Sequence, residues 1–381
     1  MSQTKVEAPF IENNNEKFKN LVINGDMRIF QRATSATTST STYDTVDRFL
    51  LYESSDGAMT SEKEDLSVAD QATTGQRTAL EMNVTTADGT IAANQFAAIY
   101  HRIEAQNLQH LLYGTSAAKN LTLSFWCKSN KTGTYCISFN KNDSTEYYIP
   151  IEYTISSANT WEKKVIVLSP TAGSTSLITA SGGAIADDNG VGLQITFGLA
   201  WGSNYHGTNN TWTTSSHLAT SNQVNWLDST SNNFYLTGVQ LEVGDQATDF
   251  EHLPFDVQFQ RCQRYLQCIT HNATTSGNVT GDNKYVMDVH FYNNTACYGS
   301  YMFPVQMRGT PTVVATDTSN AMRVYYKGTY DSIDNLSLEG TARFNHILLG
   351  NFTDIGDNSQ TGAAGHIYNY DNAQVFVQAE L

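Results

Sequence analysis

The residues best suited to ligand chemistry gather in the stretch 201–226, where aromatic side chains stand among Gly, Ser, Thr and Asn. They are Trp201, Tyr205, His206, Trp212 and Trp226. A pyranose has an apolar C–H face rimmed by hydroxyl groups, so aromatic rings beside hydrogen-bonding side chains suit it. Large apolar side chains are also costly to leave in water. The stretch therefore forms either a ligand platform or a plug at the end of a sandwich or subunit interface.

A second group of candidate ligand-binding residues follows from the alternation of apolar and polar residues along predicted strands. Alternation in the stretch 121–126 puts Leu123 and Phe125 in a core and Trp126 on the outside. The same reasoning in the stretch 99–104 turns Tyr100 and Arg102 outward. We expect one sheet face that carries Trp126, Tyr100 and Arg102. It is either a sugar-binding groove or a face covered by a loop or another subunit.

Tyrosines recur in the last hundred residues amid Asn, Asp and Gly. They are Tyr298, Tyr301, Tyr325, Tyr326, Tyr368 and Tyr370, and the Gly/Asn-rich loop 354–370 adds His366. These residues are candidate receptor contacts. The alternative is that the tyrosines are amphipathic strand residues at an interface between subunits.

Catalytic and metal-binding patterns are not found. The chain has no Gly-x-Ser-x-Gly elbow, no His-Glu-x-x-His and no phosphate loop. The 37 Asp and Glu residues guarantee chance pairs, so a carboxylate count says nothing about a glycanase. We expect no enzymatic activity, no catalytic residue, no cofactor and no metal site.

Charge and cysteine content exclude several classes of protein. With 22 Lys and Arg against 37 Asp and Glu, the formal net charge is −15, which repels nucleic acid. No window is apolar enough to span a membrane. The five cysteines match neither a zinc site nor a disulfide scaffold. Free thiols in a protein folded in a reducing cytoplasm are the expectation.

Strand patterns dominate the chain. From about residue 21 to 252, short alternating stretches are separated by turns such as Asp56-Gly57 and Asp88-Gly89. Strand patterns return from Tyr285 to the end. The predicted fold class is all-β: an antiparallel jelly-roll sandwich, a short linking helix, and a second, smaller β-sandwich domain.

The linking helix is predicted over 254–270. Its apolar positions fall at steps of 4, 3, 4 and 3, at Phe255, Phe259, Cys262, Leu266 and Ile269. This spacing fits a helix packed on its own sandwich and equally a short seam in a three-stranded helical junction. The predicted organisation is a docking tail over 1–19, a jelly roll over 20–253, the helix over 254–270, and a β tip domain over 271–381.

Several passages, in this order, resemble known proteins. They are Asn20–Met27, Leu121–Ser129, Phe234–Gly244, Ala247–Phe255 with Arg261–Tyr265, and Phe303–Arg308 with Val377–Leu381. The first three resemble the galactose-binding-like jelly roll of carbohydrate-binding modules. The whole set is similar to bacteriophage fibre proteins, in which a Cys-Gln-Arg-Tyr helix follows the closing strand. Thr237-Gly238 stands where many such modules carry a calcium-ligating Asp, so no calcium is expected.

The resemblance implies a structural and adhesive role in a phage particle. A fibre of this kind attaches the virion to host surface glycans by multivalent binding, and it is a homotrimer. Residues 1–19 would dock to other virion proteins, and the chain would fold in the host bacterial cytoplasm. The alternative is a head fibre or decoration protein that binds no glycan. Neither nucleic acid nor membrane insertion is expected.

Overall fold

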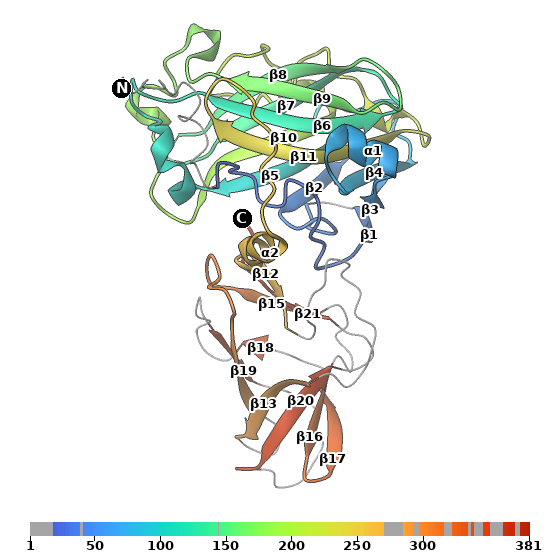
Figure 1. Ribbon diagram of the computed structural model, residues 1–381, viewed down its shortest axis with the longest axis vertical. Helices are drawn as coiled ribbons and strands as arrows, with labels where there is room; N and C mark the ends of the chain where they lie inside the picture. The colour runs from blue at the N-terminus through green and yellow to red at the C-terminus, as the bar shows by residue number, and fades with distance from the viewer. Residues whose placement is uncertain are drawn as a thin grey trace, which may run out of the picture.

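The computed structural model describes residues 18–38, 41–143, 145–269, 285–292, 297–315, 322–333, 337–338, 346–350, 361–369 and 374–381. Two layered sheets form the larger, N-terminal part, and a smaller β region lies below it in Figure 1, joined through the helix α2. Among the described residues, no helix combines the length and apolar character needed to cross a bilayer. The all-β fold class predicted from the sequence is confirmed.

The jelly roll consists of two antiparallel sheets packed face to face. The six-stranded sheet, here sheet A, has the order β1 (Ser35–Thr38), β3 (Ala58–Asp65), β4 (Thr78–Thr86), β11 (Asn233–Val243), β6 (Leu121–Ser129) and β9 (Glu162–Leu168). The five-stranded sheet, here sheet B, has the order β2 (Phe49–Ser54), β5 (Phe96–Glu104), β10 (Val191–Trp201), β7 (Gly133–Lys141) and β8 (Tyr147–Ile155).

Alternating side chains fill the space between the two sheets. Leu123 and Phe125 of β6 face Ile137 and Phe139 of β7 in one buried cluster, as the strand phase predicted. Burial of this many large apolar side chains is the main stabilising term of the domain, at about 25 cal/mol per Å² of apolar surface. The outer faces of both sheets are thereby left to polar and aromatic residues.

Short helices occupy the connections. The helix α1 (Val68–Thr74) begins where the Ser67 hydroxyl accepts a hydrogen bond from the Asp70 amide, and it ends at Gly75, whose φ of 72° suits glycine. In the described part of the chain, 3₁₀ segments lie in other connections, at η1 (Ala105–Leu111), η2 (Ala172–Ser174), η3 (Ser181–Gly183), η4 (Ser203–Tyr205) and η5 (Trp226–Asp228).

The linking helix is shorter than predicted. α2 spans Phe255–Gln263, and Leu266–Cys268 form the strand β12. The reason is long-range pairing: β12 is antiparallel to the C-terminal strand β21 (Val375–Gln378), a partner that helical spacing cannot reveal. Cys262 packs with Ile23 and Ile29 of the same chain. The predicted seam is therefore used within the chain, as a helix packed on its own sandwich.

Two further sheets build the C-terminal region. A three-stranded sheet has the order β12, β21 and β15 (Thr312–Ala315). A seven-stranded sheet, here sheet C, has the order β17 (Thr329–Ile333), β16 (Met322–Tyr326), β20 (Ala364–Asn369), β13 (Tyr285–Phe291), β14 (Cys297–Met302), β19 (His346–Gly350) and β18 (Ser337–Leu338).

The junction between the two parts is built by charged residues. The Glu380 carboxylate contacts the guanidinium groups of Arg48 and Arg32, and Arg48 lies 3.5 Å from the centre of the Tyr265 ring. Glu104 accepts two hydrogen bonds of 2.8 Å from Arg264. The last residues of the chain thus return to the jelly roll, and Figure 1 shows the C-terminus beside α2.

Candidate functional site

The residues predicted as a platform in the stretch 201–226 do not form one. Trp212 and Trp226 are buried in the core between sheets A and B, and their Nε1 atoms donate to the carbonyl oxygens of Ser169 and Asn233, at 2.8 and 3.0 Å. Trp201 stacks on Phe96 with ring centres 5.1 Å apart. The ligand platform is wrong for these tryptophans, because all three side chains are buried within the chain.

The rest of the stretch covers the outer face of sheet B. Tyr205 packs edge-on against Trp201, with ring centres 4.9 Å apart, and the His206 ring contacts the Trp201 carbonyl oxygen. Leu218 and Ala219 lie on the same face, in a cluster with Tyr100. Burial by this cover raises the pKa of the Tyr100 hydroxyl. Tyr100 is thus unsuited to stacking on a ligand.

Arg102 is engaged by the chain's own end. Its Nε atom donates to the Gln194 side chain at 2.8 Å, and its Nη1 atom donates to the main-chain oxygen of Leu381. The Tyr43 hydroxyl contacts the same oxygen at 3.0 Å. This guanidinium therefore helps to fix the C-terminal segment on the jelly roll.

Trp126 lies on the other side of the sandwich. It belongs to β6 in sheet A, whereas Tyr100 and Arg102 belong to β5 in sheet B, so the single face predicted for the three residues is wrong. Strand phase gives the side of a strand but not the sheet in which it pairs.

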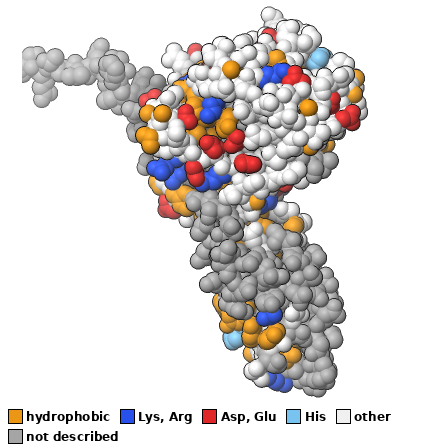
Figure 2. All heavy atoms as spheres, turned by 90° about the vertical axis from the view of Figure 1, so that its right-hand side faces the viewer, with side chains coloured by type: hydrophobic (Ala, Val, Ile, Leu, Met, Phe, Trp, Pro, Cys, Tyr) orange, Lys and Arg blue, Asp and Glu red, His pale blue; other side chains and the backbone are white. Residues whose placement is uncertain are grey.

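The outer face of sheet A carries an aromatic patch around a lysine. The Lys128 ammonium lies 4.2 Å from the centre of the Tyr235 ring and 4.9 Å from that of Trp161, with Trp126 beside them. The Tyr235 hydroxyl donates to Glu81 at 2.7 Å. Figure 2 shows hydrophobic, basic and acidic side chains gathered on the jelly roll in this way. Because Lys128 already covers two of the rings, they are not free to stack on a sugar.

Sheet C presents a different surface, which we call the tyrosine face. Neighbouring strands place outward-pointing residues side by side: Tyr325 opposite Tyr330, Arg323 opposite Tyr368, and Tyr368 opposite Tyr285. Asp288 and His366 complete it as another cross-strand pair. Figure 2 shows hydrophobic side chains gathered with basic and histidine side chains on this part of the molecule.

Contacts between rings hold the tyrosine face together. The Tyr325 ring lies 5.0 Å from Tyr368 and 5.4 Å from Tyr330, and Tyr285 lies 6.0 Å from Tyr368. The Arg323 guanidinium lies 4.3 Å from the centre of the Tyr330 ring. Such pairs stabilise cross-strand packing by roughly 0.2–1 kcal/mol each. The rings are therefore mutually oriented before any ligand arrives.

A carboxylate at one end of this face is held by two donors. The His366 Nδ1 atom lies 2.7 Å from Asp288 Oδ1, and the Tyr285 hydroxyl also hydrogen-bonds to Asp288. These hydrogen bonds, first that of His366, lower the pKa of the Asp288 carboxyl. With Nδ1 as the donor, Nε2 of a neutral His366 is an acceptor that faces away from the pair.

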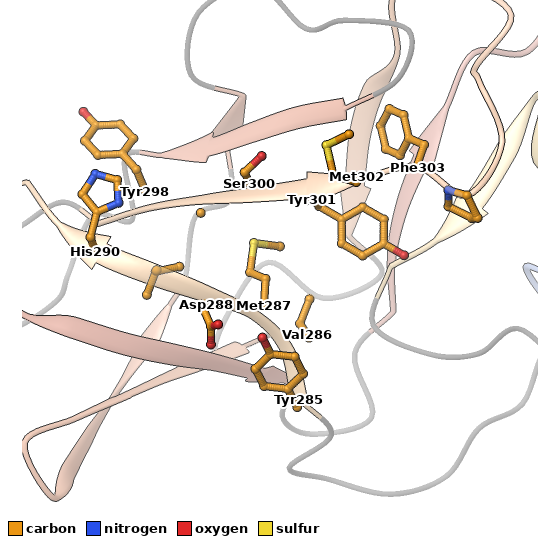
Figure 3. A pocket seen from close by; sticks show the side chains of 13 residues that line it. Tyr285, Val286, Met287, Asp288, His290, Tyr298, Ser300, Tyr301, Met302 and Phe303 are labelled. Carbon is orange, nitrogen blue, oxygen red and sulfur yellow. The ribbon is translucent and has the colours of Figure 1, made fainter.

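An open cleft adjoins the tyrosine face where β13 and β14 separate. The two strands pair only from Val289 opposite Gly299 to Phe291 opposite Cys297. Beyond that point Figure 3 shows the strands diverging, with Met287 and Tyr301 between them. The resulting cleft has a volume of about 930 Å³, within the usual range for ligand sites. Tyr285 and Asp288 belong to both cleft and face.

Sequence reasoning found part of this surface. Tyr298 lines the cleft, while Tyr325 and Tyr368 belong to the tyrosine face. Tyr301 also lines the cleft and is partly buried against the core of the same domain, whereas Tyr326 is buried. Tyr370 and much of the loop 354–370 lie outside the described residues. Tyr285, Tyr330 and Arg323 were missed, although each stands at an alternate position of a recognisable strand.

The described residues offer no metal centre. In the part of the chain that the structure describes, no group of three or more His, Cys, Asp or Glu side chains could hold a metal ion. All five cysteines are buried, and none of them forms a disulfide bond. What the C-terminal surface does offer is exposed aromatic side chains, the Asp288–His366 pair and a cleft.

No protein-family model and no curated protein matches the chain. Similar solved structures include the enzymatically active domain of tailspike protein 4 from bacteriophage CBA120, at 13% identity and a TM-score of 0.29, over 60% of this chain and 22% of that one. The family 11 carbohydrate-binding module of a Clostridium thermocellum cellulase has 10% identity and a TM-score of 0.27, over 56% and 97% of the two chains.

A third similar structure is TmCBM61 in complex with β-1,4-galactotriose, at 9% identity and a TM-score of 0.26. The match covers 59% of this chain and 99% of that one. At these identities and TM-scores the likeness says nothing about ligand or activity. Function therefore has to be inferred from the residues of this chain.

Proposed function

We propose that this protein is an adhesive, glycan-binding protein and that the tyrosine face with the β13–β14 cleft is its binding surface. The observation that carries the proposal is the set of tyrosine rings ordered across β17, β16, β20 and β13, next to a cleft of about 930 Å³. In the jelly roll, by contrast, Trp212 and Trp226 are buried, Trp201 and Tyr100 are covered on the outer face of sheet B, and Lys128 lies over Tyr235.

The chemistry of this surface suits a sugar. A pyranose ring would stack its C–H face on a tyrosine, while its hydroxyl groups reach Asp288, His366 and Ser300. Asp288 accepts hydrogen bonds, and His366 Nε2 can accept one from a second sugar hydroxyl. No catalytic step is part of the proposal, because binding alone needs only these contacts.

The finer proposal is that the protein attaches a phage particle to its host. The fibre-like passages of the sequence favour this role. Several of them meet at the junction: Glu251 accepts hydrogen bonds from the amides of Phe18 and Asn20, at 2.9 Å each, and Glu380 pairs with Arg48. These passages therefore account for the fold that displays sheet C, while the tyrosines of sheet C would supply the binding.

Assembly is the second part of the finer proposal. Weak single sites become strong when several copies bind together, which favours a homotrimer in the virion. Residues 1–19 would dock to other virion proteins; of these, residues 1–17 lie outside the described part of the chain. Because α2 packs on its own jelly roll, the apolar seam of this helix does not by itself account for a trimer. The competing role is a head fibre or decoration protein without glycan binding.

Binding of the purified protein to an array of bacterial surface polysaccharides tests the function. We expect retention on some polysaccharides, and loss of that retention in a Tyr325→Ala, Tyr368→Ala double variant. Retention that survives in a folded double variant would assign the binding elsewhere. Light scattering tests assembly: a stable monomer at all concentrations would contradict the homotrimer.

A further inference from the structure

A second cleft lies at the junction, between the jelly roll and the segment that follows α2. Its volume is about 1160 Å³, large enough for an oligomeric ligand. Its lining includes Lys19, Lys119, Arg261 and Arg264, together with His110, and contains no Asp or Glu. In a chain with a net charge of −15 and 22 Lys and Arg residues, this concentration of cations is the reverse of the overall balance.

Not all of these charges are compensated by the protein. Arg264 is neutralised by the buried Glu104, through two hydrogen bonds of 2.8 Å. Lys19 donates to the neutral Thr248 hydroxyl and to the Asp249 main-chain oxygen. Among the described residues, Lys119 has no ion-pair partner within 4.0 Å. The cleft therefore keeps a local excess of positive charge.

Arg261 is a further cation of the cleft, and the protein satisfies its hydrogen-bonding groups only in part. Its Nη2 atom donates to the Asn20 carbonyl oxygen at 3.3 Å, while its Nη1 atom is buried without a hydrogen-bond partner. Burial lowers the pKa of this guanidinium. The Glu251 carboxylate opposes this shift through its charge, but no carboxylate is paired with Arg261 within 4.0 Å among the described residues. An anion in the cleft would therefore still be attracted by the positive charge of Arg261.

The neutral residues of the lining indicate which kind of anion fits. Gln106, Asn107 and Gln306 are exposed around the cleft, and side-chain amides both donate and accept hydrogen bonds. Hydroxyl groups need both, whereas a phosphate or sulfate needs donors alone. An elongated ligand with carboxylates and hydroxyls would use the cations and the amides together.

We propose that the junction cleft binds an acidic saccharide, with sugar carboxylates facing Lys119 and Arg261. This site is separate from the tyrosine face, and the proposal does not rest on glycan binding there. It makes the protein selective for anionic polymers in spite of its own negative charge. An acidic peptide from another protein is the rival occupant.

Isothermal titration with a galacturonate oligomer and with its methyl ester tests the proposal, because the ester removes charge and keeps the sugar. We expect the galacturonate oligomer to bind and its methyl ester to bind at least tenfold more weakly. Added salt should lower the affinity for the galacturonate oligomer. Lys119→Glu should lower the affinity for the galacturonate oligomer about tenfold, since it reverses one charge near a bound carboxylate. Lys119 is exposed, so this variant should fold.

Lys163→Glu is the matched control. Lys163 is an exposed residue of β9, and the substitution changes the net charge equally, so it should alter affinity less than twofold. The Tyr325→Ala, Tyr368→Ala variant should keep this binding, which separates the two sites. Equal affinity for acid and ester, an unchanged Lys119→Glu variant, or tighter binding of an oligoglutamate peptide would each overturn the proposal.

Discussion

His366 lies directly opposite Asp288 across β20 and β13, with Nδ1 and Oδ1 2.7 Å apart. The pair is exposed, so it adds little to stability in water. Its position is more informative: it stands between the ordered tyrosines of sheet C and the cleft that opens where β13 leaves β14. An exposed polar pair beside exposed aromatic rings suits a sugar, which offers both hydroxyl groups and an apolar C–H face.

The first prediction concerns Tyr285. Its side chain is 55% exposed and belongs to both the tyrosine face and the cleft. Tyr285→Ala should weaken binding of a glycan ligand by about 1 kcal/mol, or about fivefold, because one stacking surface is lost. Titration calorimetry measures this change. Val165→Ala removes a 51% exposed side chain from the jelly roll and should leave the affinity unchanged.

Gly299 lies opposite Val289 where β13 and β14 pair, in a place without room for a larger side chain. A Cβ atom on Gly299 would lie 2.6 Å from Met287 Sδ and 2.7 Å from Val289 Cγ1. Gly299→Ala should therefore destabilise the protein by about 1–3 kcal/mol, since the core of the C-terminal domain must shift. Denaturant unfolding measures the cost. Gly309→Ala, with only one atom at 3.9 Å from the added Cβ, should cost much less, and equal costs would contradict this explanation.

The ion pair between Arg48 and Glu380 should stabilise the junction between the jelly roll and the C-terminal region. Arg48 and Glu380 have side chains that are 1% and 10% exposed, so their ion pair is shielded from water. Glu380→Gln should lower the free energy of unfolding by about 3 kcal/mol, because Arg48 would keep its buried charge without a full partner. Asp65→Asn breaks the exposed pair with Lys63 and should change it by less than about 0.5 kcal/mol. Similar losses of unfolding free energy in both variants would contradict this role of the Arg48–Glu380 pair.

Stability should also depend on the protonation of Asp47. Burial, opposed by Arg32 and by hydrogen bonds from Gln31, raises the pKa of this carboxyl to about 6 from 3.8. The folded protein thus holds the proton more tightly than the unfolded chain does. The resulting stability is complete below pH 3.8 and is lost as pH rises through 6, by about 3 kcal/mol in total.

Asp47→Asn should remove this loss, so that the free energy of unfolding of the variant changes less between pH 4 and pH 7. Glu104 affects the free energy of unfolding in a lower pH range. Desolvation tends to raise its pKa, but hydrogen bonds from Arg264 and Tyr265 prevail and lower it. Its stabilisation is present above pH 4.5 and fades as pH falls below that value. Identical pH profiles above pH 4.5 for the wild type and Asp47→Asn would exclude the role given to Asp47.

Local patterns in the sequence were enough for the strands and their inner faces. Leu123 and Phe125 lie in the core because alternation along one strand has a physical meaning wherever one face is buried. Pairing between distant strands was out of reach. It separated Trp126 from Tyr100 onto different sheets and turned Leu266 from a helix into a strand beside β21.

The candidate site was found only in part for a related reason. A tryptophan in a polar stretch is suited to a surface platform, yet Trp212 and Trp226 are buried because backbone carbonyls satisfy their ring N–H groups. Tyr325 and Tyr368 were recognised by recurrence of tyrosine. Their approach to Tyr285 depends on the order of β16, β20 and β13, which no single stretch of sequence contains.

Hydrogen exchange of the backbone amides, measured on the intact protein with and without a polysaccharide that it retains, tests the central claim most directly. Bound glycan should slow exchange at residues 285–288 of β13 and 300–302 of β14, the strand segments that line the cleft. The account is contradicted if exchange in these segments is unchanged while amides of sheet A or sheet B become protected.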